Sequence, residues 1–139
     1  EDYTVPLEKA NIVRNGDDIT LVSYGSMLQN TLEAAEIASN ELSINCEVID
    51  LRTISPYDSQ TIISSVKKTG RFISVTESPK TAGFGAELSA LIGEKTIDSM
   101  EAPIMRVTGY DVPFPFILEH DYIPSADRIL SAIDTIWEY

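Results

Sequence analysis

The chain has 139 residues, 43% of them hydrophobic, and a formal net charge of -12 at pH 7. This length and apolar fraction predict a single soluble globular domain with its own hydrophobic core. The negative charge opposes nonspecific binding to nucleic acid phosphates or anionic lipid, and no apolar run is long enough to cross a membrane. We therefore expect no nucleic acid and no membrane partner, whereas a basic protein partner suits the charge.

The N-terminal residues and the cysteine content bear on how the chain is processed and in which compartment it resides. Residues 1–6 have neither a basic flank nor an apolar stretch, so no signal peptide is expected, and the missing initiator methionine suits a fragment or a processed chain. The one cysteine, Cys46, excludes an intramolecular disulfide and suits a reducing compartment. Its position at the start of a predicted buried strand favours a core residue over a reactive thiol.

The first predicted elements are two strands and a helix. A weak strand at 10–13 is separated by a turn at 15–18 from a strong strand at 19–24, which is rich in β-branched residues. A helix follows, with an apolar stripe at helical spacing that predicts its buried face: Leu28, Leu32, Ala35, Ala38 and Leu42. The next strong strand is expected at 46–51.

The middle of the chain predicts a second helix and a third strong strand. Ser55-Pro56-Tyr57-Asp58 resembles a capped helix start with proline at the first helical position. The helix should bury Ile62, Ile63 and Val66 and end at Gly70, after Lys67 and Lys68. The strand at 71–76 comes next, and we expect all four strong strands to be buried on both faces.

The last third predicts a helix, a strand, a long loop and a final helix. The helix from about Phe84 should bury Phe84, Leu88, Leu91 and Ile92, and the strand covers 104–108. The stretch 108–124 contains three prolines, so it can be neither a continuous helix nor a central strand, and loops of this length are often functional or interfacial. The final helix starts near Ser125 and should bury Ile129, Leu130, Ile133, Ile136 and Trp137.

This alternation of strands and helices predicts the α/β class: a three-layer α/β/α domain with a mostly parallel sheet of about five strands. One edge strand can run antiparallel. No repeat or linker divides the chain, so residues 1–139 form one domain.

Polar side chains follow the predicted strands, at the carboxyl edge where parallel sheets bind ligands. Asp50 and Arg52 follow the second strong strand, Glu77 the third and Asp111 the fourth. In one interpretation Arg52 holds an anion or a carboxylate, or serves a subunit contact. In the other, which we favour, Asp50, Arg52 and Glu77 pair with each other and cap helix starts. A receiver-type phosphorylation site at Asp50 is excluded, because that domain needs an acidic pair where Tyr24-Gly25-Ser26 stands.

Gly83 and Gly85 flank Phe84 at a predicted helix start, where exposed N–H groups attract anions. The dinucleotide pattern needs a third glycine where Leu88 stands, and the Lys-Ser/Thr of a phosphate loop is absent. Close packing of the turn is therefore the favoured reason for these glycines. His120, the only histidine, lies beside acidic neighbours and has no second His or Cys ligand, so neither a metal site nor a catalytic base is expected. The residues alone thus predict an α/β domain with a polar edge and leave several enzyme classes open.

A family resemblance covers essentially the whole chain. The segments that carry it, with Glu77, are 5–10 (VPLEKA), 18–25 (DITLVSYG), 47–58 (EVIDLRTISPYD), 69–71 (TGR), 83–87 (GFGAE), 101–104 (EAPI), 112–115 (VPFP) and 122–124 (YIP). They resemble the transketolase-type C-terminal domain, in the version found in beta subunits of thiamine-diphosphate-dependent 2-oxo acid dehydrogenases. Glu8 departs from the pattern, since glycine is expected there, and only the local turn is affected.

The resemblance implies a division of labour in a longer parent protein. Thiamine diphosphate and Mg would sit between an alpha subunit and the N-terminal domain of the beta subunit, and the acyl group would pass to a dihydrolipoyl acyltransferase. This domain would then carry no catalytic, cofactor-binding or metal residue of its own. It would serve assembly with the alpha subunit and a second beta subunit. Trp137, Glu138 and Tyr139 would be candidates for contact with the acyltransferase, and a simply packed last helix is the alternative. The compartment would be prokaryotic cytoplasm or the mitochondrial matrix.

Two alternatives stay open at this point. One is the C-terminal domain of a transketolase or a deoxyxylulose-phosphate synthase, against which the 112–115 loop argues. The other is a free-standing module that binds a small ligand through Asp50, Arg52, Glu77 and Gly83. The sequence leaves the 2-oxo acid undecided among pyruvate, a branched-chain acid and acetoin.

Overall fold

The structure is a computed structural model, and it describes residues 4–139. Residues 1–3, on which the expected lack of a signal peptide partly rests, lie outside the described residues. Within the described part, no helix is both long enough and apolar enough to cross a lipid bilayer.

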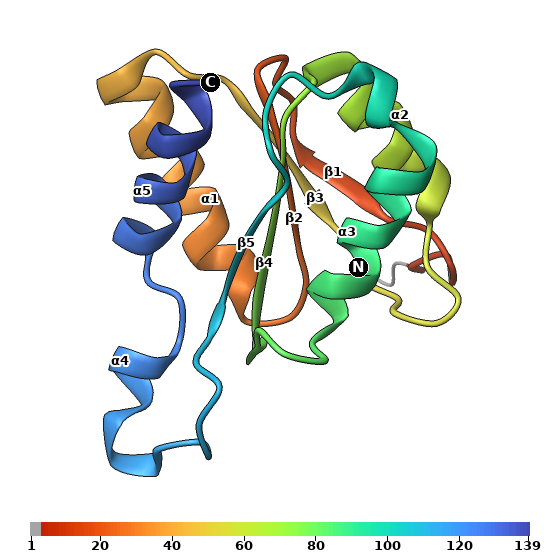
Figure 1. The fold of residues 1–139 in the computed structure, drawn as a ribbon. Coiled ribbons are helices and arrows are strands. Elements are labelled where there is room, and N and C mark those ends of the chain that lie inside the picture. The colour runs from red at the N-terminus through yellow and green to blue at the C-terminus, as the bar shows by residue number, and fades with distance from the viewer. Residues whose placement is uncertain (1–3) are drawn as a thin grey trace.

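The sheet has five strands in the order β1-β3-β2-β4-β5, and the predicted α/β class is confirmed (Figure 1). The neighbours among β2 to β5 pair in parallel, whereas β1 runs antiparallel to β3 at one edge. The strands are β1 (Asn11–Arg14), β2 (Ile19–Ser23), β3 (Cys46–Asp50), β4 (Phe72–Pro79) and β5 (Met105–Gly109). The predicted strands thus all form, with shifts of one to three residues at their ends.

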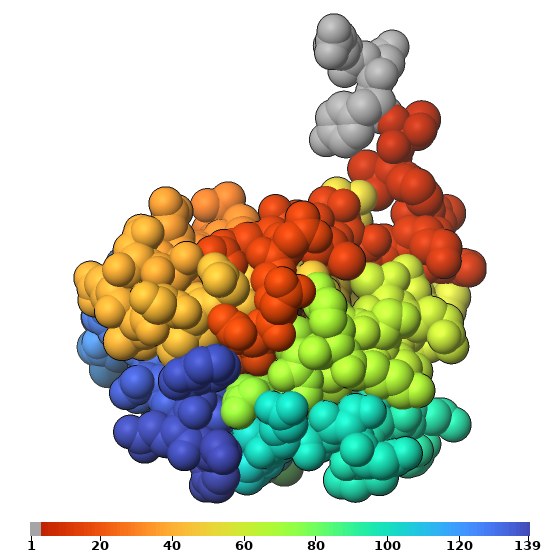
Figure 2. Space-filling view, turned by 90° about the horizontal axis from the view of Figure 1, so that it is seen from above, coloured from red at the N-terminus to blue at the C-terminus, as the bar shows by residue number. Residues whose placement is uncertain are grey.

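Helices cover both faces of the sheet. Helices α1 and α5 pack on one face, and α2 and α3 pack on the other, as Figure 1 and the view from above in Figure 2 show. The main helices are α1 (Met27–Ile37), α2 (Ser59–Thr69), α3 (Phe84–Lys95) and α5 (Ala126–Trp137). Shorter pieces are η1 (Ala38–Leu42), η2 (Ile97–Ser99), η3 (Phe116–Leu118) and α4 (Glu119–Tyr122).

Two hydrophobic clusters fill the spaces between the layers. The cluster under α1 and α5 includes Ile19, Leu21 and Ile133, and the cluster under α2 and α3 includes Phe72 and Leu88. The central strand β2 is buried along its whole length, as its apolar sequence predicts for a strand covered on both sides. The edge strand β5 differs from the prediction, because Met105 and Arg106 are only half-buried where no further strand covers them.

The apolar stripe predicted for the first helix is partly wrong. The fully buried side chains of α1 are Met27, Thr31, Ala34 and Ala35, while Leu28 and Leu32 pack at the margin of the cluster. Ala38 is buried as predicted, but Leu42 is 39% exposed. After Ile37 the helix widens into the π-helical turn η1, which changes the angle per residue and so rotates Leu42 away from the core.

Two side chains of the final helix, Leu130 and Trp137, are less buried than predicted. Ile129, Ile133 and Ile136 are buried, but Leu130 is only partly buried and Trp137 is 40% exposed. The Arg71 guanidinium lies 4.9 Å from the centre of the Trp137 ring, so the ring packs against a cation at the surface instead of the core.

The second helix begins later than predicted. It starts at Ser59, and its N-cap is Asp58, whose Oδ1 accepts a hydrogen bond from the Thr61 backbone N–H at 3.2 Å. The Asp58 carboxylate also accepts from the Thr61 hydroxyl at 2.9 Å and from the Ala10 backbone N–H at 3.3 Å. Since the helix begins only after its cap, Asp58, Pro56 lies in the bend before the helix and is not the first helical residue. The predicted end is confirmed, since Gly70 takes a left-handed conformation there (φ 69°).

Replacing Asp58 with alanine should cost about 1–2 kcal/mol of folding free energy, because one buried carboxylate caps α2 and ties it to the segment before β1. Burial alone would raise the pKa of Asp58, but the hydrogen bonds from Thr61 and Ala10 and the nearby Lys9 ammonium outweigh it and lower the pKa. The contribution is therefore present above the pKa of the unfolded carboxyl and is lost as the pH falls through the lower folded pKa. Urea titrations at pH 7 and pH 3 check this: the wild type and Asp58→Ala should differ clearly at pH 7 and less at pH 3.

Cys46 and Glu47 begin β3 deep in the structure. Cys46 is fully buried in the first cluster, which confirms the predicted core role, and burial raises the pKa of its thiol to about 12. Glu47 is also buried, and its carboxylate accepts a hydrogen bond from the Lys68 ammonium of α2. Asp17, on the turn before β2, places a second carboxylate 3.5 Å from the same ammonium.

Glu8, the one position that departs from the family pattern, lies in the turn before β1. Glu8 has φ 62°, a left-handed backbone conformation in which glycine is favoured and L-residues are strained. The backbone at position 8 therefore has the positive φ that explains why glycine is expected there, and Glu8 adopts this conformation.

Candidate functional site

The carboxyl ends of β3, β2, β4 and β5 meet at one edge of the sheet, the lower edge in Figure 1. Asp50 and Arg52 therefore lie beside the end of β2, and Glu77 and Asp111 follow on its other side. The same edge receives the start of β1, because that strand is antiparallel and Asn11 pairs with Asp50.

Arg52 is bound to its near neighbour Asp50. The Arg52 backbone N–H donates to Asp50 Oδ1 at 3.3 Å, and its Nε donates to Oδ2 at 3.4 Å. Arg52 has φ 60°, so the chain turns sharply directly after β3. Part of the expected pairing is thus present, and the guanidinium is held at the edge while its side chain stays 32% exposed.

Glu77 stands apart from this pair, which corrects the expected three-membered cluster. Its Oε2 accepts a hydrogen bond from the Ser26 hydroxyl at 2.8 Å, next to the start of α1. Strand β2 lies between β3 and β4 in the sheet, so its own following turn, with Ser26, comes between Glu77 and Arg52. The acidic residue that caps a helix is Asp58, at the start of α2, and the sequence predicted it only as part of that helix start.

Gly83 and Gly85 lie where backbone and side chains approach too closely for a Cβ atom. A Cβ on Gly83, the N-cap of α3, would be 2.3 Å from the Pro79 carbonyl oxygen and 2.7 Å from Ser78 Oγ. A Cβ on Gly85 would be 2.9 Å from Ser74 Oγ. Close packing of α3 against the end of β4 accounts for both glycines, and this was the interpretation favoured from the sequence.

Asp111 joins the loops that follow β4 and β5. Its carboxylate accepts hydrogen bonds from the Thr81 backbone N–H at 2.9 Å and the Thr81 hydroxyl at 2.6 Å, which lower the pKa of Asp111. The sequence did not point to Thr81, because its role depends on two loops that lie 30 residues apart in the chain.

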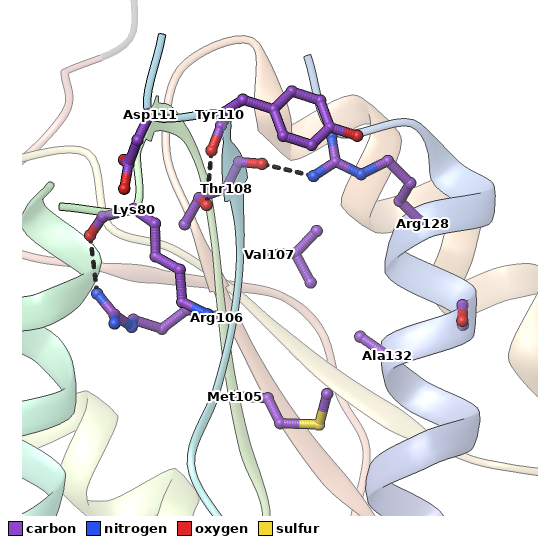
Figure 3. A pocket seen from close by; sticks show the side chains of 11 residues that line it. Lys80, Met105, Arg106, Val107, Thr108, Tyr110, Asp111, Arg128 and Ala132 are labelled. Carbon is purple, nitrogen blue, oxygen red and sulfur yellow. Dashed lines mark hydrogen bonds between the residues drawn. The ribbon is translucent and has the colours of Figure 1, made fainter. Parts of the chain in front are cut away.

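A pocket of about 470 Å³ opens beside Asp111, along the free edge of β5 (Figure 3). Arg106 and Arg128 lie on opposite sides of the strand, and Lys80 lies near Arg106. Both arginines bind backbone carbonyls. Arg106 Nη1 donates to the Lys80 carbonyl at 2.9 Å, and Arg128 Nη2 donates to the Thr108 carbonyl at 2.7 Å. These cations therefore hold the loops around the pocket together.

Residues 110–124, called the arm below, extend from the end of β5 past the carboxyl edge and return to α5, with α4 at the bottom of Figure 1. As predicted, the arm is neither a continuous helix nor a central strand. The sequence did not predict how much apolar surface it exposes, the most exposed side chains being Phe116 at 88% and Ile117 at 94%. Tyr110, Val112, Phe114 and Leu118 are also more than half exposed.

Trp137 and Tyr139, the candidates at the C-terminus, lie away from this edge. The C-terminus lies at the opposite, upper end of the molecule in Figure 1, and Trp137 and Tyr139 are exposed there. Among residues 4–139, no group of three or more His, Cys, Asp or Glu side chains could hold a metal ion, and His120 lies on the exposed surface of α4.

Comparison with known proteins identifies the domain. The family model for the transketolase C-terminal domain matches residues 8–129. The mitochondrial 2-oxoisovalerate dehydrogenase subunit beta of Dictyostelium discoideum is 51% identical over 88% of this chain, and the pyruvate dehydrogenase E1 component subunit beta of Leifsonia xyli is 44% identical over 97% of it. The chain spans only 33% and 40% of the lengths of these two relatives.

The solved structures agree on the fold. A split-gene transketolase, described as an inactive beta4 tetramer, superimposes with a TM-score of 0.85 at 24% identity, over 99% of this chain and 44% of that one. The transketolase of Pichia stipitis gives a TM-score of 0.58 at 14% identity, over 94% of this chain and 18% of that one. From the match over residues 8–129, the chain belongs to the transketolase C-terminal domain family.

Proposed function

We propose that the chain is the C-terminal domain of the beta subunit of a thiamine-diphosphate-dependent 2-oxo acid dehydrogenase, where it serves subunit assembly. The observation that carries this proposal is the identity of 44% and 51% to beta subunits of such enzymes over nearly the whole chain. These relatives are longer than this chain, so the proposal places residues 1–139 within a longer parent protein.

One observation supports placing the cofactor outside this domain. The chain spans only 33% and 40% of the lengths of the two beta-subunit relatives, so most of the proposed parent protein lies outside residues 1–139. In the parent enzyme the cofactor would carry out the decarboxylation, and this domain would hold the subunits in place.

The proposed partners are an alpha subunit, a second beta subunit and a dihydrolipoyl acyltransferase. The relatives include mitochondrial and bacterial proteins, which is compatible with a mitochondrial matrix or a prokaryotic cytoplasm. Their names cover both 2-oxoisovalerate and pyruvate dehydrogenases, so the test must compare both 2-oxo acids as substrates.

The test produces the full-length protein that contains this chain, with and without the alpha subunit from the same source. We expect decarboxylation of pyruvate or 2-oxoisovalerate, coupled to acylation of a lipoyl domain, only when both subunits and thiamine diphosphate are present. Calorimetric titration of residues 1–139 alone should detect no micromolar binding of thiamine diphosphate. Ketol transfer between sugar phosphates by the full-length protein would contradict the proposal and favour a transketolase.

Arg52→Ala should weaken assembly of the full-length protein about tenfold while changing the stability of the domain by less than about 0.5 kcal/mol. The reason is that Arg52 stands at the exposed carboxyl edge with one local partner, Asp50, and contributes little to the core. Sedimentation velocity over a dilution series measures the assembly. The matched control is Lys67→Ala, which removes an exposed cation from α2; equal effects of the two variants would show that only net charge matters.

A further inference from the structure

Asp58 has a second carboxylate oxygen that the capping of α2 does not require. Its Oδ1 accepts the Thr61 backbone N–H at 3.2 Å, which is the hydrogen bond that caps the helix. A serine, a threonine or an asparagine supplies the same single acceptor without a charge. The Asp58 side chain is only 5% exposed, and burying a charge is costly unless its oxygens are bound. The second oxygen therefore needs an explanation of its own.

Oδ2 of Asp58 binds the chain that leads into β1. It accepts the Ala10 backbone N–H at 3.3 Å, and the Lys9 ammonium lies 3.8 Å from it. The Thr61 hydroxyl also donates to Oδ2 at 2.9 Å and so helps to orient the carboxylate. One side chain thus joins the start of α2 to Ala10, which lies 48 positions earlier in the sequence.

This contact lies where the chain meets the body of the domain. Residues 4–9 are exposed, whereas Ala10 is half-buried and packs against the cluster under α2 and α3. Figure 2 shows the start of the described chain rising away from the rest of the domain. The pairing of β1 with β3 begins one residue later, at Asn11. The Asp58 contact therefore extends the ordered body of the domain toward the N-terminus, from the sheet to Ala10 and Lys9.

We propose that Asp58 is a positioning residue whose Oδ2 anchors the entering chain, so that the rigid body of this domain begins at Lys9. Bending between this domain and the preceding part of the parent protein is then confined to residues before Lys9. This role rests on the proposed function, because it requires a longer chain that precedes the domain. Relative motion is the default for domains that an exposed connector joins, so an anchor at the connector limits where that motion occurs.

Asp58→Asn in the full-length protein separates the two roles of this side chain. The asparagine keeps Oδ1 and can cap α2, while its amide nitrogen can donate to the Thr61 hydroxyl. The same nitrogen can neither accept the Ala10 N–H nor attract the Lys9 ammonium. Hydrogen exchange followed by mass spectrometry should therefore show about tenfold faster exchange of the Ala10 amide in the variant, with the amides at the start of α2 unchanged.

Trypsin gives a second measurement at the same place, because it cleaves after lysine and the Ala10 N–H belongs to the bond between Lys9 and Ala10. Cleavage requires local opening of this bond, so it should be about tenfold faster in Asp58→Asn than in the wild type. Lys9→Ala, followed by hydrogen exchange, should speed exchange at Ala10 only about twofold. The reason is that the Lys9 side chain is 66% exposed and its ion pair is screened by water.

The matched control is Asp18→Asn, because the Asp18 carboxylate also accepts a distant backbone N–H, that of Asn45 at 2.7 Å, but lies directly before β2. The anchor is upheld if Asp58→Asn alone speeds exchange and cleavage at Ala10 while the start of α2 keeps its protection.

Three results would overturn the anchor. Asp58→Asn could exchange like the wild type at Ala10, or Asp18→Asn could speed exchange there equally. The start of α2 could also loosen as much as Ala10, which would assign the effect to lost capping. Assays of decarboxylation and of ketol transfer on the same preparations test the proposed function separately, so each of the two proposals can fail while the other stands.

Discussion

Phe72→Ala should lower the free energy of unfolding by about 3–5 kcal/mol, because it empties a fully buried aromatic site at the start of β4. Phe72 belongs to the cluster between the sheet and helices α2 and α3, together with Val66, Leu88 and Ile92. The loss combines the transfer free energy of the ring with the cavity that the rigid sheet cannot collapse. Urea unfolding followed by circular dichroism measures it.

The chain offers a matched control for this prediction. Phe116→Ala deletes the same ring at a site that is 88% exposed, and it should change the unfolding free energy of the domain by less than about 0.5 kcal/mol. A large loss for Phe116→Ala would show that the arm packs on the domain in solution. A small loss for Phe72→Ala would mean that the second cluster is loosely packed.

Lys68→Met should cost about 2 kcal/mol, because it leaves the Glu47 carboxylate inside the sheet without its cation. Removing one partner of a fully buried pair typically costs 3–5 kcal/mol, and the lower figure applies because the Lys68 side chain is 42% exposed and water reaches it. Lys67→Met changes the neighbouring exposed lysine and should be nearly neutral. Chemical denaturation of the three proteins at pH 7 gives the comparison.

The same pair makes stability depend on alkaline pH. Burial alone would lower the pKa of Lys68, but the hydrogen bond to Glu47 and the charges of Glu47 and Asp17 outweigh it and raise the pKa above 10.5. The pair therefore stabilises the fold fully below the pKa of the unfolded lysine and loses this effect as the pH rises through the higher folded value. The gap between wild type and Lys68→Met should be constant from about pH 6 to 9 and narrow above about pH 10.5. A gap that widens with pH would assign the stabilisation to another group.

Much of the fold could be predicted because its strands are short, β-branched runs between turn residues, and its helices alternate with them. The sequence could not predict the order of the strands across the sheet. That order separates Glu77 from Asp50 and Arg52, although all three follow strands at the same edge. The start of α2 was misplaced because Ser55 and Asp58 are both good caps, and only the tertiary contact of Asp58 with Ala10 distinguishes them.

Burial was the least predictable property. Trp137 and Phe116 are apolar and appear in regions that could equally face a core or a partner, and sequence periodicity says nothing about which surface is covered. The same limit applies to Arg128, whose contacts with Thr108 and Tyr122 depend on how α5 packs beside β5. The polar edge was predicted in outline, whereas the arm that extends beyond it was recognised from the sequence only as a long, proline-containing loop.

The burial of Cys46 makes the protein convenient for site-specific spectroscopy. A thiol with a pKa of about 12 and no contact with water is almost never a thiolate near neutral pH, so it reacts very slowly with maleimides. A cysteine introduced at Ile117 or at Leu7, both highly exposed, would then be labelled selectively without removing the native residue. A fluorophore at Ile117→Cys would report on the arm, and a label at Leu7→Cys, before the opposite edge strand β1, would report on a site away from it.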